Sequence, residues 1–257
     1  MAVAKDLALT VDWVQILAEQ FSVEIDDFRT FAFNAAIARY AASLGENSQS
    51  LAERAQRLDL STEEWGQVLH LATNHKTSFF RYMPVVNIIT NLALSIAHPR
   101  ILSVGCSTGE EVYSIAASLV KAKKNSFSVH GVDISPQCIR IARAGVYSPH
   151  PDIGDDVSYL NQGGKRQFVQ WLRDSCTFEQ HNIVGDQLIG FEAPDIIVTQ
   201  NMLIYYRVET RFQILERLAN LLPPGGHLIT GPAEDARWKS EIVARVKNPN
   251  ASVFQKV

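Results

Sequence analysis

Two features in the middle of the chain could together bind a nucleotide-like ligand. The first is a loop, residues 104–111, which carries Gly105 and Gly109 between a short apolar run and an amphipathic segment. Glycine permits a tight turn and lets a ligand approach the backbone closely. The second is Asp133, which ends the next apolar run roughly 20 residues further on, where a carboxylate can accept hydrogen bonds from a ribose.

The loop by itself is equally compatible with a plain helix start. Ser107 with Glu110, or Thr108 with Glu111, has the three-residue spacing of a capping box. Asp133 shifts the balance, because an acid at the end of the second strand is typical of an adenosine-binding site. We therefore predict such a site on a nucleotide-binding sheet.

The charge at the helix start discriminates between adenosine cofactors. A dinucleotide needs a pyrophosphate cradle, usually GxGxxG, and a helix start without negative charge. Here the loop has two glycines, and Glu110 and Glu111 open the helix. Two carboxylates repel a pyrophosphate but suit the ammonium and sulfonium groups of S-adenosylmethionine. Electrostatics therefore favours a methyltransferase over a dehydrogenase.

Other constellations that carry chemistry are missing from the sequence. The three cysteines form no CxxC pair, which disfavours a disulfide framework or a cysteine-based zinc site. The histidines have no HxxxH or HExxH spacing, so we expect no metal. No Cys/His or His/Asp pairing suggests nucleophilic catalysis. The expected reaction is thus one that needs no general base.

The elements that must position these residues follow from the apolar periodicity. Up to about residue 72 the chain has helical three-to-four spacing, with Ser61 and Glu64 as a capping box. From Arg100 short apolar runs alternate with amphipathic segments, which predicts an α/β fold with a mostly parallel sheet. Two strand-like runs near the end predict a hairpin. We expect a helical subdomain over 1–72, a cofactor-binding domain over 73–257, and a short insertion at about 147–181.

Composition limits the class of protein. Hydrophobic residues make up 46% and charged residues 20% of 257 residues, which is typical of a folded globular protein. The net charge of −3 argues against nucleic-acid binding. No apolar run approaches the roughly 20 residues of a membrane helix, and the amino-terminal sequence is not typical of a secretory signal. We expect a cytoplasmic protein without membrane insertion.

Six ordered motifs resemble those of the CheR-type protein-glutamate O-methyltransferases of bacterial chemotaxis. The resemblance is strong from about Thr73 to Gly231 and weak before it. The motifs are residues 75–81 (HKTSFFR), 105–116 (GCSTGEEVYSIA), 131–135 (GVDIS) with 142–147 (ARAGVY), 182–183 (NI), 200–206 (QNMLIYY) and 221–231 (LLPPGGHLITG). Six motifs in the right order are far more specific than any one of them.

The resemblance implies a Rossmann-like S-adenosylmethionine-dependent fold that methylates glutamate side chains of a protein, namely cytoplasmic helices of a chemoreceptor. It implies that Arg81 orients the substrate carboxylate and that Tyr205 donates a hydrogen bond to it or walls the methyl group. Phe79 and Phe80 would exclude water or simply pack in the core. The implied cofactor-binding residues are His75, Thr77, Arg81, Gly105, Glu111, Asp133, Asn182, Ile183, Asn201 and Met202.

Departures from the family pattern leave alternatives open. His75 replaces an asparagine, and Gln200 replaces an arginine. Residues 1–70 hold five basic residues against eleven acids, a sum of −6, whereas the corresponding family region is usually basic. Either Arg54 and Arg57 form a local basic strip, or the partner is less acidic than a receptor bundle. A methyltransferase for another protein or a small acid, or a catalytically weak cofactor-binding adaptor, are the other hypotheses.

Overall fold

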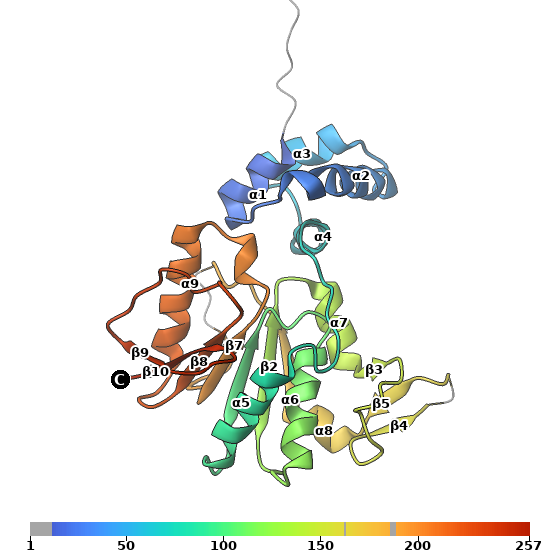
Figure 1. Cartoon of the computed structure of the whole chain (residues 1–257). Coiled ribbons are helices and arrows are strands. Elements are labelled where there is room, and N and C mark those ends of the chain that lie inside the picture. Colours follow the sequence, from blue (N-terminus) through green and yellow to red (C-terminus); the bar gives the residue numbers. More distant parts are fainter. Residues whose placement is uncertain (1–11, 162, 186–188) are drawn as a thin grey trace, which may run out of the picture. The chain divides into compact units, whose positions relative to one another are not determined.

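The computed structural model describes residues 12–161, 163–185 and 189–257. The chain divides into two compact units, residues 1–74 and 75–257 (Figure 1). Among the described residues, no helix combines the length and the apolar character that a membrane crossing requires.

The described part of the first unit is helical, as the sequence predicts, and consists of four helices. They are α1 (Trp13–Phe21), α2 (Asp27–Ser43), α3 (Ser48–Gln56) and α4 (Thr62–Ala72). A polar residue precedes each helix, and its side chain accepts a backbone N–H of the first turn. The predicted capping box is confirmed: Ser61 accepts the N–H of Glu64, whose carboxylate accepts the N–H of Ser61.

Arg54 is held inside this unit and does not form an open basic strip with Arg57. Its guanidinium contacts Glu46 and Glu64, each at 2.7 Å. Arg57 directly follows α3, the helix that contains Arg54, and is exposed. Of the two alternatives, the local basic strip therefore fails at Arg54, because the acids of neighbouring segments neutralise it, which the helical spacing alone did not reveal.

We predict that Arg54→Met lowers the melting temperature of the protein by a few degrees at neutral pH. The bonds from Ser61 and Arg54 lower the pKa of Glu64 below its ordinary value of 4.5. A lowered acid pKa stabilises the folded state above that ordinary value, and the contribution is lost as the pH falls through the folded-state pKa. The difference between wild type and variant should therefore shrink in acid. Thermal unfolding at pH 7 and below pH 4 measures it, with Arg57→Met as the matched control. An unchanged melting temperature for Arg54→Met would contradict the role of this ion pair.

The second unit contains the predicted α/β sheet. Its order is β6-β2-β1-β7-β8-β10-β9, and the first five strands are parallel to one another. The strands are β1 (Arg100–Val104), β2 (Ser128–Asp133), β6 (Cys176–Gln180), β7 (Ile196–Thr199), β8 (His227–Thr230), β9 (Val243–Val246) and β10 (Ser252–Lys256). The antiparallel β9 and β10 confirm the predicted hairpin.

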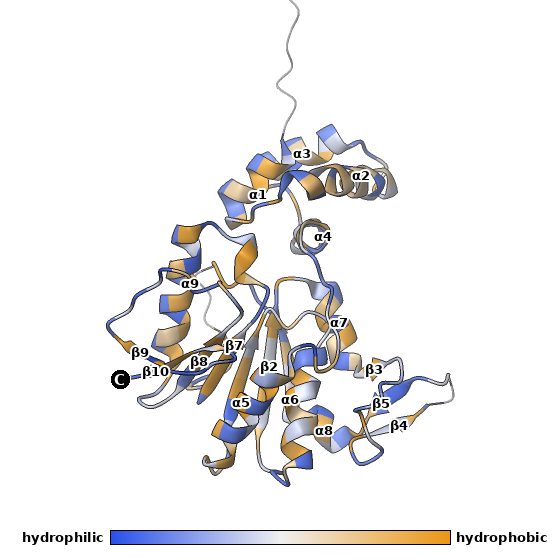
Figure 2. Cartoon of the chain, viewed as in Figure 1, coloured by the Kyte–Doolittle hydropathy of each residue, from blue (hydrophilic) through white to orange (hydrophobic). Residues whose placement is uncertain are grey.

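Helices cover this sheet, and apolar strands fill its centre. The helices are α5 (Met83–Leu94), α6 (Glu110–Lys121), α7 (Pro136–Ala144), α8 (Gln170–Ser175) and α9 (Val208–Leu221). α5 packs beside α6, and α7 packs on β2 and β6 (Figure 1). Every residue of β7 is buried, as are the last four residues of β1, which explains their apolar sequences (Figure 2).

The expected insertion at 147–181 is shorter than predicted. A separate antiparallel sheet joins β3 (Val146–Tyr147), β5 (Arg166–Phe168) and β4 (Ser158–Leu160) in that order. The stretch Cys176–Gln180, however, is β6 and pairs in parallel with β2. Cys176 and Phe178 alternate with more exposed residues, which is a strand pattern. The small sheet is anchored by Phe168, which stacks on Tyr113 with ring centroids 4.1 Å apart.

The strand order reverses direction at β1. From β1 the chain passes to β2 and β6 on one side, and later returns to β7 on the other. In open α/β sheets, ligands bind beyond the carboxyl ends of the strands at such a switch point. Gly105 and Asn201 lie in the loops that follow β1 and β7, and Asp133 is the last residue of β2. The topology therefore brings three of the predicted motifs to one edge.

Candidate active site

Gly105 and Met202 bring the first and third of these loops into contact. Gly105 has a φ of +78°, and its N–H donates to the carbonyl of Val132 at 2.8 Å. A Cβ at this position would lie 2.6 Å from Cγ of Met202. Any side chain here would therefore displace Met202 and separate two loops that sequence analysis assigned to the same site.

Asp133 is a buried carboxylate with a fixed orientation. One oxygen accepts the N–H of Ser107 at 2.8 Å, and the other accepts the N–H of Ser135 at 2.9 Å. Burial raises the pKa of Asp133, whereas Ser135, His75 and Ser107 oppose that shift. Since a carboxylate has about four acceptor positions, the two bonds leave room for a hydroxyl donor. This is the geometry that a ribose-binding acid needs.

The start of α6 differs from both capping boxes that the sequence allowed. Gly109, with a φ of +94°, is the N-cap residue and supplies no side-chain cap. Thr108 instead donates its hydroxyl to the carboxylate of Glu110 at 2.6 Å. The capping-box expectation is therefore wrong here, because glycine occupies the N-cap and both glutamates lie in the first turn.

Glu111 is a partly buried acid whose pKa lies near neutrality. It accepts a hydrogen bond from the hydroxyl of Ser103, on β1, at 2.7 Å. Burial raises the pKa of Glu111 from 4.5 to about 7; the bond from Ser103 opposes this, Glu234 adds to it, and Arg81 opposes it. Burial destabilises the ionised form of Glu111. A positively charged ligand beside it would stabilise that ionised form.

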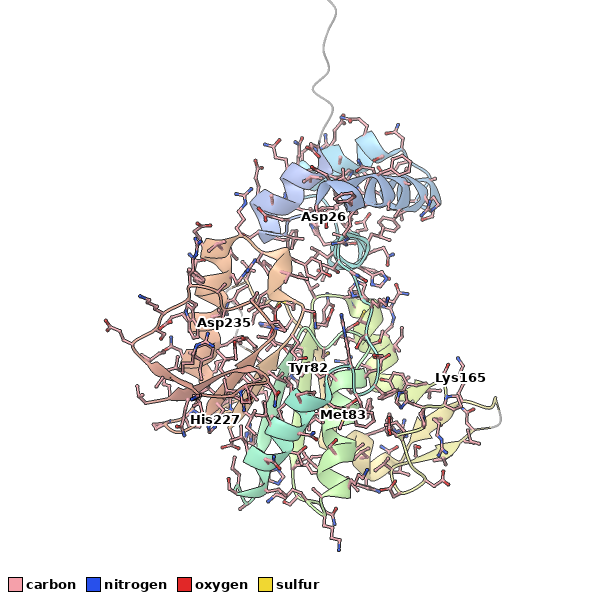
Figure 3. All side chains as sticks on the ribbon, viewed as in Figure 1. Asp26, Tyr82, Met83, Lys165, His227 and Asp235 are labelled. Atoms are coloured by element: carbon pink, nitrogen blue, oxygen red, sulfur yellow. The ribbon has the colours of Figure 1, made fainter. Side chains whose placement is uncertain are left out.

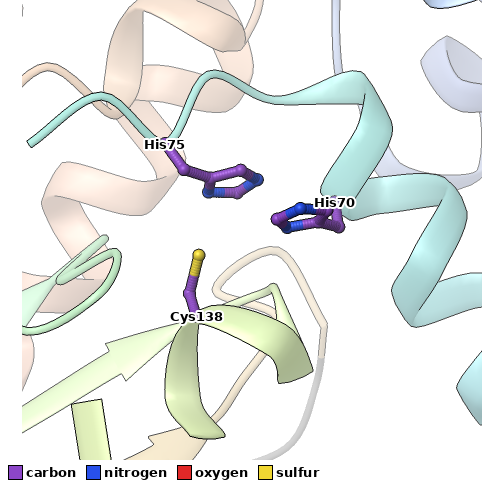
Figure 4. A group of neighbouring side chains, drawn as sticks. All are labelled: His70, His75 and Cys138. Atoms are coloured by element: carbon purple, nitrogen blue, oxygen red, sulfur yellow. The ribbon is translucent and has the colours of Figure 1, made fainter. Parts of the chain in front are cut away.

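The segment 75–81 lies beside the first and second loops. The hydroxyl of Ser107 donates to the backbone carbonyl of His75 at 3.0 Å. A ring nitrogen of His75 lies within 4.8 Å of Sγ of Cys138, on α7 (Figure 4). His75 also lowers the pKa of Asp133, so the two side chains act electrostatically on each other. Thr77 is half-buried in the same segment.

Arg81 and the preceding phenylalanines have different surroundings. Arg81 is exposed, donates to the carbonyl of Lys76 at 2.8 Å, and stabilises the anion of Glu111 electrostatically. Phe79 is buried against Tyr147, with ring centroids 5.0 Å apart. Phe79 is thus a core residue, while Arg81 combines solvent access with proximity to an acid of the site.

The loop after β7 carries a left-handed residue and a short 3-10 helix, Leu203–Tyr205. Asn201 is exposed with a φ of +57°, a conformation that asparagine tolerates better than most residues. Tyr205 is half-buried, and its N–H donates to the carbonyl of Met202 at 3.2 Å. Gln200, at a position where the resemblance implies an arginine, has a buried amide nitrogen without a hydrogen-bond partner in the described part of the chain.

Asn182 and Ile183 follow β6 next to Asp133. The N–H of His181 donates to the backbone carbonyl of Asp133 at 2.9 Å. Asn182 accepts the N–H of Val184 at 3.1 Å, and Ile183 is buried. The structure therefore places this pair at the same edge of the sheet as the other predicted residues.

Sequence reasoning did not identify three polar groups of this edge. Ser103 holds Glu111, Ser135 holds Asp133, and Glu234 accepts backbone N–H groups of the loop after β7. Ser135 follows Asp133 at the spacing of an Asx turn, which was a usable signal. Ser103 and Glu234 reach the site through tertiary structure, so no local pattern indicates them.

Residues 75–251 match the family model described as CheR methyltransferase, SAM binding domain. The chain belongs to the CheR methyltransferase family. Its similarity to a "Chemotaxis protein methyltransferase 2" of Pseudomonas aeruginosa is 32% identity over 216 residues, 77% of this chain and 76% of the relative. A "Chemotaxis protein methyltransferase" of Campylobacter jejuni is 27% identical over 225 residues, 83% of this chain and 84% of the relative.

A second kind of relative is longer than this chain. The "Probable biofilm formation methyltransferase WspC" of Pseudomonas aeruginosa is 30% identical over 215 residues, 78% of this chain but 51% of the relative. Its counterpart in Pseudomonas putida is covered to 46%. The chain thus spans about half the length of these two relatives.

The residues of the site fit S-adenosylmethionine, the cofactor of this family's domain. Asp133 is oriented and retains acceptor positions for a ribose hydroxyl. Glu111 has a pKa raised to about 7 and gains from a positive ligand. Gly105 leaves no space for a side chain beside Met202. The two carboxylates at this edge therefore suit a ligand that is positively charged at one end and carries a ribose.

Proposed function

We propose that this CheR-family methyltransferase transfers a methyl group to glutamate side-chain carboxylates of a signalling protein, giving methyl esters. One observation carries the proposal: Arg81 has an exposed guanidinium that donates to the carbonyl of Lys76 at 2.8 Å and acts electrostatically on Glu111. The planar guanidinium fork of arginine matches a carboxylate. A cation at this place can hold an acidic side chain beside the cofactor site.

Methylation of a glutamate side chain does not require a general base. A glutamate carboxylate in a model peptide has a pKa of about 4.3, so it is already ionised at neutral pH. S-adenosylmethionine supplies the electrophilic methyl group when bound. The residues of the chain then have two tasks, alignment of the carboxylate and exclusion of water. Arg81 performs the first, and Tyr205 donates a hydrogen bond to the carboxylate or limits the space around the methyl group.

The proposed cofactor contacts are distributed over the loops of the switch point. Asp133 takes the ribose, and Glu111 takes the positively charged methionine end. His75, Thr77 and Arg81 approach from the segment before α5. The backbones and side chains of Gly105, Asn182, Ile183, Asn201 and Met202 complete the surroundings of the cofactor.

The identity of the protein substrate is a separate part of the proposal. Chemoreceptor helices are the first candidate, because two relatives are named as chemotaxis methyltransferases. A less acidic signalling protein is the second. It is favoured by the charge of residues 1–70, a sum of −6, and by the ion pairs that occupy Arg54.

Methyl transfer from tritiated S-adenosylmethionine tests the proposal. The substrates are membranes of the source organism that contain its receptors, and a soluble fraction of the same cells. We expect base-labile counts, since methyl esters hydrolyse in base and methylated amines do not. Mass spectrometry should place the methyl group on glutamate, and replacing that glutamate by alanine should remove the label. Base-stable counts, or no incorporation into either fraction, would contradict the proposal.

A further inference from the structure

Glu234, shortly after β8, binds the backbone of the loop that follows β7. Its side chain is 1% exposed. One carboxylate oxygen accepts the N–H of Leu203 at 2.8 Å, and the other accepts the N–H of Gly231 at 2.9 Å. The backbone N–H groups of Asn201 and Met202 also stabilise the anion. A single buried carboxylate thus collects donors from three consecutive residues of one loop.

Gly231 provides the space for this carboxylate. A Cβ at position 231 would lie 2.2 Å from the Oε2 atom of Glu234. The N–H of Gly231 is shared between Glu234 and the carbonyl of Thr199, which lies 2.9 Å away at the end of β7. The glycine therefore joins the ends of β7 and β8 and leaves the pocket that the carboxylate occupies.

The loop that Glu234 binds has little regular structure of its own. Asn201 has a φ of +57°, and a 3-10 helix of three residues follows. The N–H of Leu203 is bonded to the carboxylate, and those of Asn201 and Met202 stabilise its charge. An anion that several backbone N–H groups bind holds that backbone in one conformation. Burial raises the pKa of Glu234, and the backbone donors oppose that shift. The donors thus favour the charged form that the loop needs.

We infer that Glu234 is a positioning residue, whose carboxylate fixes the backbone of residues 201–203 so that Met202 contacts Gly105 and Tyr205 has a defined place. Glu234 does not itself touch the reacting groups. The effect on activity depends on the proposed methyl transfer, whereas the effect on the loop does not.

The first test is Glu234→Gln, which keeps the shape of the side chain. Its amide NH₂ group must face N–H donors in place of one acceptor oxygen, so part of the loop loses its anchor. We expect a roughly tenfold lower kcat at saturating cofactor, because small displacements of aligned groups are costly. Backbone amides of residues 201–203 should exchange with deuterium faster. Glu234→Asp, which keeps the charge, should recover part of the rate.

Asp235 offers a matched control. Asp235, which is labelled in Figure 3, is also an acid with little exposure, 3%, and it directly follows Glu234 in the sequence. Its partners, however, are the hydroxyl of Thr230 at 3.1 Å and the guanidinium of Arg245, not the loop after β7. Asp235→Asn should lower the melting temperature while leaving kcat and the exchange of residues 201–203 close to wild type.

Gly231→Ala gives a second test that does not alter Glu234 itself. The added methyl group should displace the carboxylate and reproduce the effects of Glu234→Gln. In a Glu234→Ala background the same change should cost much less, because the group that it displaces is missing. Such non-additivity is the signature of a shared contact.

The outcomes separate the two proposals. If Glu234→Gln folds and its loop exchange and kcat match those of Asp235→Asn, Glu234 has no special positioning role and the inference fails, although methyl transfer stands. If the wild type methylates no protein but loop exchange still rises in Glu234→Gln and Gly231→Ala, the proposed function fails and the role of Glu234 in the loop stands.

Discussion

Replacing Arg81 by alanine is expected to reduce methyl transfer by roughly 100- to 1,000-fold, the cost typical of removing one preorganised donor from an active site. Arg81 is exposed, and within the described part of the chain its hydrogen bond goes to the carbonyl of Lys76, an exposed residue, so its removal leaves no buried hydrogen-bond partner unsatisfied. The melting temperature should therefore change little. Lysine should restore part of the rate, because an ammonium is a point charge and lacks the fork.

Three measurements identify the cause of this loss. Steady-state rates give kcat and KM for the protein substrate, calorimetry gives the Kd of the cofactor, and thermal unfolding gives stability. Arg140→Ala, an exposed arginine on α7, is the matched control and should behave as wild type. A loss that appears in the Kd of the cofactor and not in transfer would move Arg81 from the substrate to the cofactor. Full activity of Arg81→Ala would remove it from the site.

Most of the core sheet was predictable because the signals of its strands are local; β6, which we expected within the insertion, is the exception. Residues 101–104 and 196–199 are short apolar runs, and both are buried parallel strands. The final hairpin follows from two strand-like runs around Asn248, Pro249 and Asn250. A strand that is buried on both faces has a continuous apolar sequence, and a hairpin has turn residues between its two strands. Both patterns can be recognised in a short stretch of sequence.

The small antiparallel sheet was not predictable in the same way. Its strands have two or three residues, and one of them begins with Arg166. What holds it is the stacking of Phe168 on Tyr113, two residues that are far apart in sequence. Segments this short do not develop a periodicity, so their structure depends on tertiary contacts that no local window contains.

Some residues of the candidate site could likewise be recognised from local sequence, and others only from tertiary contacts. Its glycines, Asp133 and the acidic helix start were recognisable from spacing and charge. The partner of Glu111 is Ser103, which the turn between β1 and the first turn of α6 brings within reach. Glu234 meets Leu203 only after β8 pairs with β7. For Arg54 the helical spacing suggested a side chain that is open to a partner. It gave no sign of the ion pairs with Glu46 and Glu64.

The affinity for S-adenosylmethionine should fall by about tenfold between pH 8 and pH 6, because Glu111 must lose its proton to bind the positive end of the cofactor. Its pKa in the free protein is about 7, so near neutrality about half of the molecules hold a neutral Glu111. A positive ligand lowers this pKa, and binding at pH 7 should therefore release about half a proton. The sign is fixed: affinity rises as the pH rises through 7 and levels off above it.

Calorimetry in buffers of different ionisation enthalpy measures both the Kd and the proton release. Glu111→Gln should bind roughly 10- to 100-fold more weakly at pH 8, the range for a lost hydrogen bond to a charged group. Its affinity should then be nearly independent of pH from 6 to 8. Glu110→Gln is the matched control, since the neighbouring carboxylate is bonded to the hydroxyl of Thr108; it should keep the pH dependence. S-adenosylhomocysteine, which keeps the ammonium but lacks the sulfonium, shows which positive group Glu111 contacts. If wild type and Glu111→Gln share one pH profile, Glu111 does not hold the cofactor, and the raised pKa is only a consequence of its burial beside Ser103.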